Sequence, residues 1–154
     1  MAPKLSFEAI ILGEAQPSGS KTAGLTKDGR RFYRDANPGA AAWKATVRKE
    51  TSAAMMGLPL LTGPLSLTAI FYAGRPKSHY RTKNGQPTDE LKPGAPIFKT
   101  TKPDLDKLVR ALKDGMTRAV YIDDSQVARH RLIDKLYGNP PRVELIVAQL
   151  EGEA

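Results

Sequence analysis

The sequence contains no cysteine and only two histidines. The absence of cysteine excludes disulfide bonds, thiolate metal ligands and cysteine nucleophiles together. The histidines, His79 and His130, do not have the spacing of a metal-ligand pair, so we expect no histidine-based metal site. Aromatic residues make up only 6% of the chain, which predicts a core built mainly from aliphatic side chains.

Long apolar runs are also missing, and we expect no secretory signal. No stretch of about 18 or more consecutive apolar residues occurs, so we expect no transmembrane helix. The first five residues lack the apolar stretch of a secretory signal. No Walker loop, Rossmann glycine pattern or nucleophile elbow is present. The 154 residues, 40% of them hydrophobic, suffice for one compact domain, which we expect to be cytoplasmic and free of membrane contacts.

Basic residues are in excess and are concentrated in two stretches. The formal net charge is +8, and segments 21–34 and 75–102 carry +4 and +5, so the remainder sums to −1. Solvated loops would show the same clustering, but it favours a polyanionic partner, nucleic acid first. The candidate DNA-binding residues are Lys21, Arg30, Arg31, Arg34, Arg75, Lys77, Arg81, Lys83, Lys102 and Lys107.

Hydrophobic patterning predicts a mixed α/β chain. Alternating or continuous apolar residues predict strands at 5–12 and 64–72 and within 120–133 and 142–150. The stretches 13–37 and 74–100 are expected to be long basic loops, a length that is usually functional. This order of elements predicts the α/β or α+β class, with a single small domain in which a mixed β-sheet packs with two main helices.

The two helices are expected at 37–56 and 101–118. Asn37-Pro38 has the chemistry of a helix start, Gly57 that of a helix end, and Trp43 is expected to anchor the first helix in the core. Gly115 is either an interior blemish of the second helix or its early end. The apolar residues of that helix follow the helical period at Leu105, Leu108, Val109, Leu112 and Met116.

Four aspartates in two short segments form the candidate catalytic centre. Asp104 and Asp106 stand at the start of the second helix, and Asp123-Asp124 precede a strand. Hydrolysis of a phosphodiester needs a metal ion that activates water and neutralises charge on the phosphate. Mg²⁺ favours one or two carboxylates together with water and substrate phosphate, which these aspartates would supply.

Helix geometry limits how these carboxylates can meet. Residues two apart on a regular helix diverge, so Asp104 and Asp106 converge only if Asp104 lies at or before the cap, as Pro103 favours. Arg110 is four residues after Asp106 and shares its face, where it could orient Asp106 or stabilise a phosphate. The structural alternative is that the aspartates cap helices and turns.

Several ordered motifs resemble one known family. The segments K-P-D-L-D-K-L and Y-I-D-D-S-Q-V, followed by K-L-Y-G at 135–138, resemble the RusA family of Holliday junction resolvases. The basic stretch R-P-K-S-H-Y at 75–80 also resembles the segment that precedes the acidic motif in that family. The resemblance spans roughly residues 5 to 150, and its specific part lies in 99–137.

The resemblance implies a small homodimeric endodeoxyribonuclease of bacterial or phage-infected cells. Such an enzyme uses Mg²⁺, with Mn²⁺ as a substitute, and resolves four-way DNA junctions by symmetric nicks in recombination and repair. Carried over by position, the metal-binding carboxylates are Asp104, Asp106 and the Asp123-Asp124 pair, with Asp124 the favoured ligand and Asp123 its helper. The family's lysine falls on Arg110, which keeps the charge but does not deprotonate.

Two other functions fit parts of the sequence. A non-catalytic protein that binds DNA junctions would need the basic segments, but it gains nothing by placing carboxylates against phosphate. A phosphohydrolase acting on a small nucleotide would use the acidic cluster, but the large basic segments favour a longer polyanion.

Overall fold

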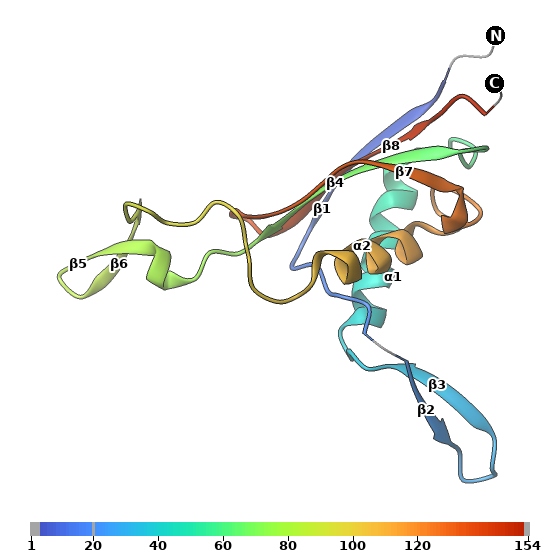
Figure 1. The fold of residues 1–154 in the computed structure, drawn as a ribbon, viewed down its shortest axis with the longest axis horizontal. Coiled ribbons are helices and arrows are strands. Elements are labelled where there is room, and N and C mark those ends of the chain that lie inside the picture. Colours follow the sequence, from blue (N-terminus) through green and yellow to red (C-terminus); the bar gives the residue numbers. More distant parts are fainter. Residues whose placement is uncertain (1–3, 20, 153–154) are drawn as a thin grey trace.

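A four-stranded sheet forms the centre of the computed structural model, which describes residues 4–19 and 21–152 (Figure 1). Its strands are β1 (Ser6–Leu12), β4 (Leu65–Ala73), β7 (Val127–Tyr137) and β8 (Arg142–Gln149), in the order β1-β8-β4-β7. Strands β4 and β7 run parallel and the other neighbours run antiparallel, so the prediction of a mixed sheet is confirmed. All four strands lie in or overlap the ranges expected from the sequence.

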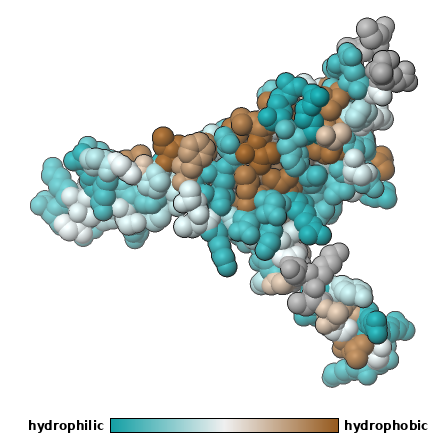
Figure 2. Space-filling view, viewed as in Figure 1, coloured by the Kyte–Doolittle hydropathy of each residue, from teal (hydrophilic) through white to brown (hydrophobic). Residues whose placement is uncertain are grey.

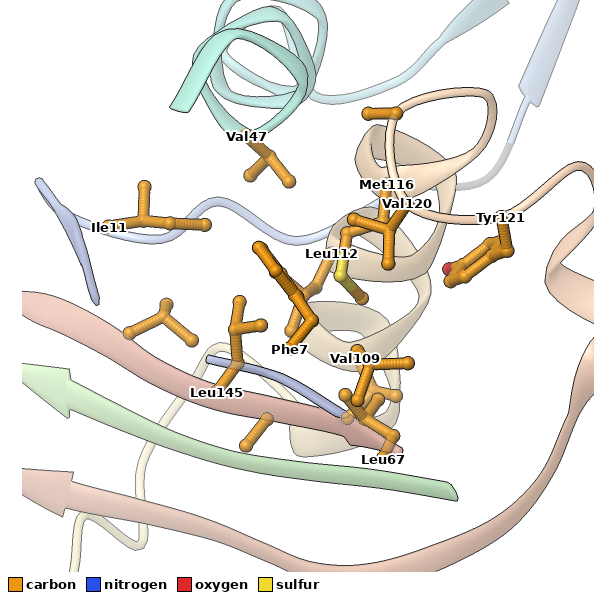
Figure 3. Packing of buried hydrophobic residues seen from close by; sticks show 14 of the residues in the cluster. Phe7, Ile11, Val47, Leu67, Val109, Leu112, Met116, Val120, Tyr121 and Leu145 are labelled. Carbon is orange, nitrogen blue, oxygen red and sulfur yellow. The ribbon is translucent and has the colours of Figure 1, made fainter. Parts of the chain in front are cut away.

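Two helices cover one face of this sheet. They are α1 (Ala40–Ala54) and α2 (Leu105–Met116), and the core lies between them and the sheet. Figure 3 shows Val109 and Leu112 of α2 beside Phe7 and Leu67 of the sheet. Trp43 is 5% exposed and belongs to the core cluster, as predicted. The fold is therefore the predicted α+β arrangement in a single small domain.

Both helices begin later than their sequence signals indicate. Helix α1 has Gly39 as its N-cap, and the Oδ1 atom of Asn37 accepts a hydrogen bond from the Gly39 backbone N–H at 3.1 Å. The expectation that Asn37 is the cap was wrong, because its side chain instead shapes the turn before the helix. Helix α2 begins at Leu105 rather than 101, with Asp104 as its N-cap. No helix among the residues described is long and apolar enough to cross a bilayer.

The two stretches expected to be long loops each contain a β-hairpin. Strands β2 (Lys21–Leu25) and β3 (Arg31–Asp35) form one, and β5 (Tyr80–Lys83) and β6 (Gln86–Leu91) form the other. Asn84 and Gly85 both have positive φ, at 53° and 75°, as a tight hairpin turn requires. Both hairpins project away from the sheet and helices (Figure 1), and their surfaces are largely hydrophilic (Figure 2).

Gly115 allows the two helices to approach closely. It is buried inside α2, and a Cβ atom built on it would lie 2.7 Å from Cβ of Val47 on α1. It is therefore neither an early end of the helix nor a mere blemish. We expect Gly115→Ala to lower the free energy of unfolding by about 1–3 kcal/mol despite alanine's better helix propensity, because the core has no room for the added carbon. Urea unfolding checks this, and a gain in stability would contradict the packing.

Candidate active site

The start of α2 presents Asp104 in an extended conformation. Its φ and ψ are −68° and 140°, and its side chain makes no capping hydrogen bond. The structural alternative, a carboxylate that caps the helix, is therefore not realised at Asp104. Its Oδ2 lies 3.9 Å from Nζ of Lys107, an exposed pair that contributes little to stability.

Asp106 and Asp124 line one pocket although 18 positions separate them in the sequence. The pocket holds about 480 Å³ between α2 and β7. It also contains Arg110 and Lys113, which follow Asp106 at helical spacings of four and seven residues and so share its face. The remaining lining residues are Leu105, Val109, His130 and Ile133. Figure 2 shows an apolar area beside this part of the molecule.

The neighbouring carboxylates Asp123 and Asp124 have different environments. Asp123 Oδ1 accepts a hydrogen bond from the Ser125 backbone N–H at 2.8 Å, and this hydrogen bonding holds the pKa of Asp123 below its usual value. Partial burial raises the pKa of Asp124, and the negative charges of Asp114 and Asp123 add to the effect, against the opposing charge of Lys113. A cation near Asp124 would relieve this repulsion.

Gln126 holds the turn that carries both residues. Its Oε1 accepts hydrogen bonds from the backbone N–H groups of Ile122 and Asp123, at 3.0 and 3.1 Å. Its Nε2 donates to the carbonyls of Leu61 and Gly63, each at 3.1 Å. One amide thus ties the acidic turn to the segment before β4, which fixes Asp124 relative to the sheet.

Asp104 lines a second pocket, of about 500 Å³, which shares no lining residue with the first. Glu14, Lys102 and Lys107 line it too, so it combines two carboxylates with two ammonium groups. Asp104 is at the cap, as convergence with Asp106 requires, yet the two aspartates line different pockets. Within residues 4–19 and 21–152, no group of three or more acidic or histidine side chains is arranged to hold a metal ion. The three-aspartate metal site stays a prediction.

The sequence did not lead us to Lys113, and it gave no reason to place His130 in the site. Lys113 could have been found from its helical spacing to Asp106 and Arg110, which places all three on one face. His130 lies on β7 and lines the same pocket. Burial and the charge of Lys113 lower its pKa, which favours a neutral ring. No signal in the sequence brings His130 to α2, because that contact depends on the sheet.

The candidate DNA-binding residues lie mainly on the hairpins. Arg30, Arg31 and Arg34 are exposed on the first hairpin, with Arg30 3.4 Å from Asp28 and Arg34 over the ring of Phe32. The side chain of Lys21 lies outside the part of the molecule that the structure describes. Lys102 and Lys107 flank Asp104.

The second hairpin carries Lys77, Arg81 and Lys83 at or near its strands, all exposed. Arg81 lies 3.4 Å from Glu90. Arg75 has a structural role at the base of the hairpin, where it donates a hydrogen bond to the Pro96 carbonyl at 2.8 Å and lies over the Tyr137 ring. The three exposed residues are therefore the cleaner test of DNA contact.

We expect a triple variant, with Lys77, Arg81 and Lys83 changed to glutamine, to bind DNA more weakly. The affinity of this variant should also depend less steeply on salt concentration. Each lost phosphate contact should lower the log–log salt slope by about 0.9. A filter-binding titration across salt concentrations measures the slope, with the exposed Lys49 on α1, changed to glutamine, as a control. An unchanged slope in the triple variant would mean that this hairpin points away from DNA.

Comparison with known proteins places the chain in a family. The family model for endodeoxyribonuclease RusA matches residues 14–148, which include all four aspartates of the candidate site. The chain belongs to the RusA endodeoxyribonuclease family. This RusA family member is also similar to the uncharacterized protein YqaN of Bacillus subtilis (strain 168), at 34% identity over 91 residues. That match covers 59% of this chain and 61% of YqaN.

Proposed function

We propose that this RusA family member is a Mg²⁺-dependent endodeoxyribonuclease that resolves four-way DNA junctions by paired symmetric nicks. Such a reaction serves DNA recombination and repair. The observation that carries the proposal is the shared pocket of Asp106 and Asp124, which lies beside Arg110 and Lys113 in a strongly basic chain. Family membership supports nuclease chemistry at this pocket.

The residues of the pocket fit a magnesium ion. Two carboxylates supply oxygen donors, and Mg²⁺ usually retains waters and substrate phosphate in its other positions, so two protein ligands suffice. Repulsion from Asp114 and Asp123 at Asp124 also favours a bound cation. A Mg²⁺ ion bound there would supply an activated water and neutralise charge on the scissile phosphate, and Mn²⁺ would do the same.

The chain's own residues have separate tasks in this proposal. Asp106 and Asp124 would hold the ion, and Asp104, at the N-cap of α2, is the third carboxylate of the proposed set. Asp123 stabilises the turn through Ser125 and supports Asp124. Arg110 stabilises negative charge on the phosphate without transferring a proton, since a guanidinium does not deprotonate.

The ammonium of Lys113 is the second cation of this pocket. It adds charge stabilisation on the side of Asp124, where its charge partly offsets the rise in pKa caused by burial. Both cations lie on the face of α2 that carries Asp106, so a phosphate that enters the pocket meets the carboxylates and the cations together.

DNA contact comes from the basic surfaces around the pocket. Lys102 and Lys107 lie next to Asp104, and the two hairpins extend the positive surface beyond the sheet (Figure 1). Contacts of this kind position the phosphate backbone and read no sequence. Recognition of a branched structure then depends on where the arms of the DNA leave the pocket.

Nicking of a synthetic four-way junction tests the proposal against simple binding. We expect cleavage in Mg²⁺ or Mn²⁺ and none in EDTA, with linear duplex of the same sequence cut much less. The rival reading, a non-catalytic junction-binding protein, predicts a gel shift without any nick. Rapid hydrolysis of a small phosphodiester with no action on the junction would favour the small-nucleotide alternative.

We expect the active form to be a homodimer. One chain has one Asp106–Asp124 pocket, whereas resolving a junction needs two nicks on opposing strands, and a two-fold dimer matches a two-fold junction. Light scattering at micromolar concentration should give about twice the 16.8 kDa mass of the chain. A mass of one chain, both free and on junction DNA, would contradict the dimer.

A further inference from the structure

The segment before Asp104, residues 97–103, is held by few backbone hydrogen bonds. Residues 97–99 pair with the edge of β7: the Lys99 backbone N–H donates to the Lys135 carbonyl at 3.0 Å, and the Tyr137 N–H donates to the Ile97 carbonyl at 2.9 Å. In the described part of the chain, residues 100–103 make no backbone–backbone hydrogen bond. The position of Asp104 therefore depends on side chains that reach this short segment.

Lys135 of β7 supplies that connection. Its Nζ donates hydrogen bonds to the carbonyls of Thr101 and Pro103, both at 2.7 Å. The second bond is to the residue directly before Asp104, across 32 positions of sequence. Hydrogen bonds from a charged donor are short and strong, so these two can fix a segment without regular structure.

The surroundings of Lys135 strengthen this connection. Its side chain is half-buried and lines a small cavity with Phe71, Pro103 and Leu108, so apolar groups surround part of the stem and shield the bonds from water. Lys99 adds a hydrogen bond from its Nζ to Oγ1 of Thr101 at 2.9 Å, and the same ammonium lies 5.4 Å from the centroid of the Tyr137 ring on β7. Among the described residues, only Lys135 donates side-chain hydrogen bonds from the central sheet to this segment.

We propose that Lys135 is a positioning residue, which holds segment 101–103 and thereby fixes Asp104 and the start of α2 relative to Asp124. The proposal rests on the proposed nuclease function for its consequence in catalysis. It does not require Lys135 to touch DNA or metal. Since Asp106 lies two residues after Asp104, a loosened segment also changes the approach of Asp106 to the pocket it shares with Asp124.

Two variants separate positioning from charge and from packing. Lys135→Met keeps the length of the stem and removes the donors, and Lys135→Arg keeps charged donors at a similar reach. Lys49→Met, at an exposed position on α1, is the matched control. Each protein is compared by single-turnover junction nicking, by junction affinity and by hydrogen–deuterium exchange of residues 99–108. Thermal unfolding checks the fold.

Lys135→Met is expected to raise exchange at Lys99 and Leu108, whose backbone N–H groups donate hydrogen bonds at the two ends of the segment, by about tenfold. Exchange in the rest of the central sheet should stay unchanged. The nicking rate should fall by about tenfold or more while junction affinity stays within about threefold. Lys135→Arg should have an exchange rate and a nicking rate close to those of the wild type. Lys49→Met should match the wild type in both.

Unchanged exchange and unchanged nicking in Lys135→Met would overturn the proposal. Equal loosening of the whole sheet would also overturn it, because Lys135 would then be a general stabiliser. A wild-type protein that never nicks junctions would contradict the nuclease function, while the exchange measurement would still decide whether Lys135 holds the segment.

Discussion

Asp106→Asn is expected to abolish junction cleavage while leaving junction binding within a few-fold of the wild type. The change removes one negative charge from the carboxylate pair that faces the pocket, and an amide is a poor ligand for Mg²⁺ in that position. Loss of several kcal/mol of transition-state stabilisation corresponds to a fall in rate on the order of a thousandfold or more. Binding persists because it comes mainly from lysine and arginine contacts to phosphates.

The adjacent pair Asp123 and Asp124 gives a matched comparison for this result. Asp124→Asn should resemble Asp106→Asn, since both residues line the pocket. Asp123→Asn should lower the cleavage rate much less, because an asparagine oxygen can still accept the hydrogen bond from the Ser125 backbone N–H. Nicking and gel-shift assays on the same preparations measure both quantities. Near-normal cleavage by Asp106→Asn would remove Asp106 from the site.

Lys113→Met is expected to slow cleavage by about a hundredfold to a thousandfold. This is the usual effect of removing one donor that stabilises negative charge developing in the transition state. The ammonium belongs to the pocket of Asp106 and Asp124, and its charge already acts on Asp124. A single-turnover nicking assay at saturating protein measures the effect on the chemical step separately from DNA affinity.

Two further variants make this result specific. Lys113→Arg keeps the charge and should retain a substantial part of the rate, whereas Lys49→Met removes a lysine from an exposed position on α1 and should change nothing. Equal rates for Lys113→Met and the wild type would show that the charge at this position has no part in the reaction.

Local patterns were enough to predict the core of the fold. The alternating residues Leu65, Leu67, Ala69 and Phe71 of β4 are all buried, as their spacing indicates. The hairpins were missed because their composition was interpreted as loop, although Asn84-Gly85 and Asp28-Gly29 are typical hairpin turns. Their strands are short and project from the body, so they lack the apolar alternation that identifies a half-buried strand.

The candidate site was predictable only in part, for a geometric reason. Helix periodicity brings Asp106, Arg110 and Lys113 to one face, and this could be read from the sequence. The approach of Asp124 and His130 to that face depends on parallel pairing of β4 with β7, which no local pattern specifies. The bonds of Gln126 and Lys135 to distant carbonyls are likewise long-range features.

The most direct test of the account is cleavage of a four-way junction, end-labelled on each strand in turn, as Mg²⁺ is titrated from zero. We expect two nicks at symmetric positions on opposing strands, which appear with Mg²⁺. Both nicks should be lost in Asp106→Asn and Asp124→Asn, although both variants still bind the junction. A wild-type protein that binds the junction equally well but leaves every strand intact at all Mg²⁺ and Mn²⁺ concentrations would contradict it.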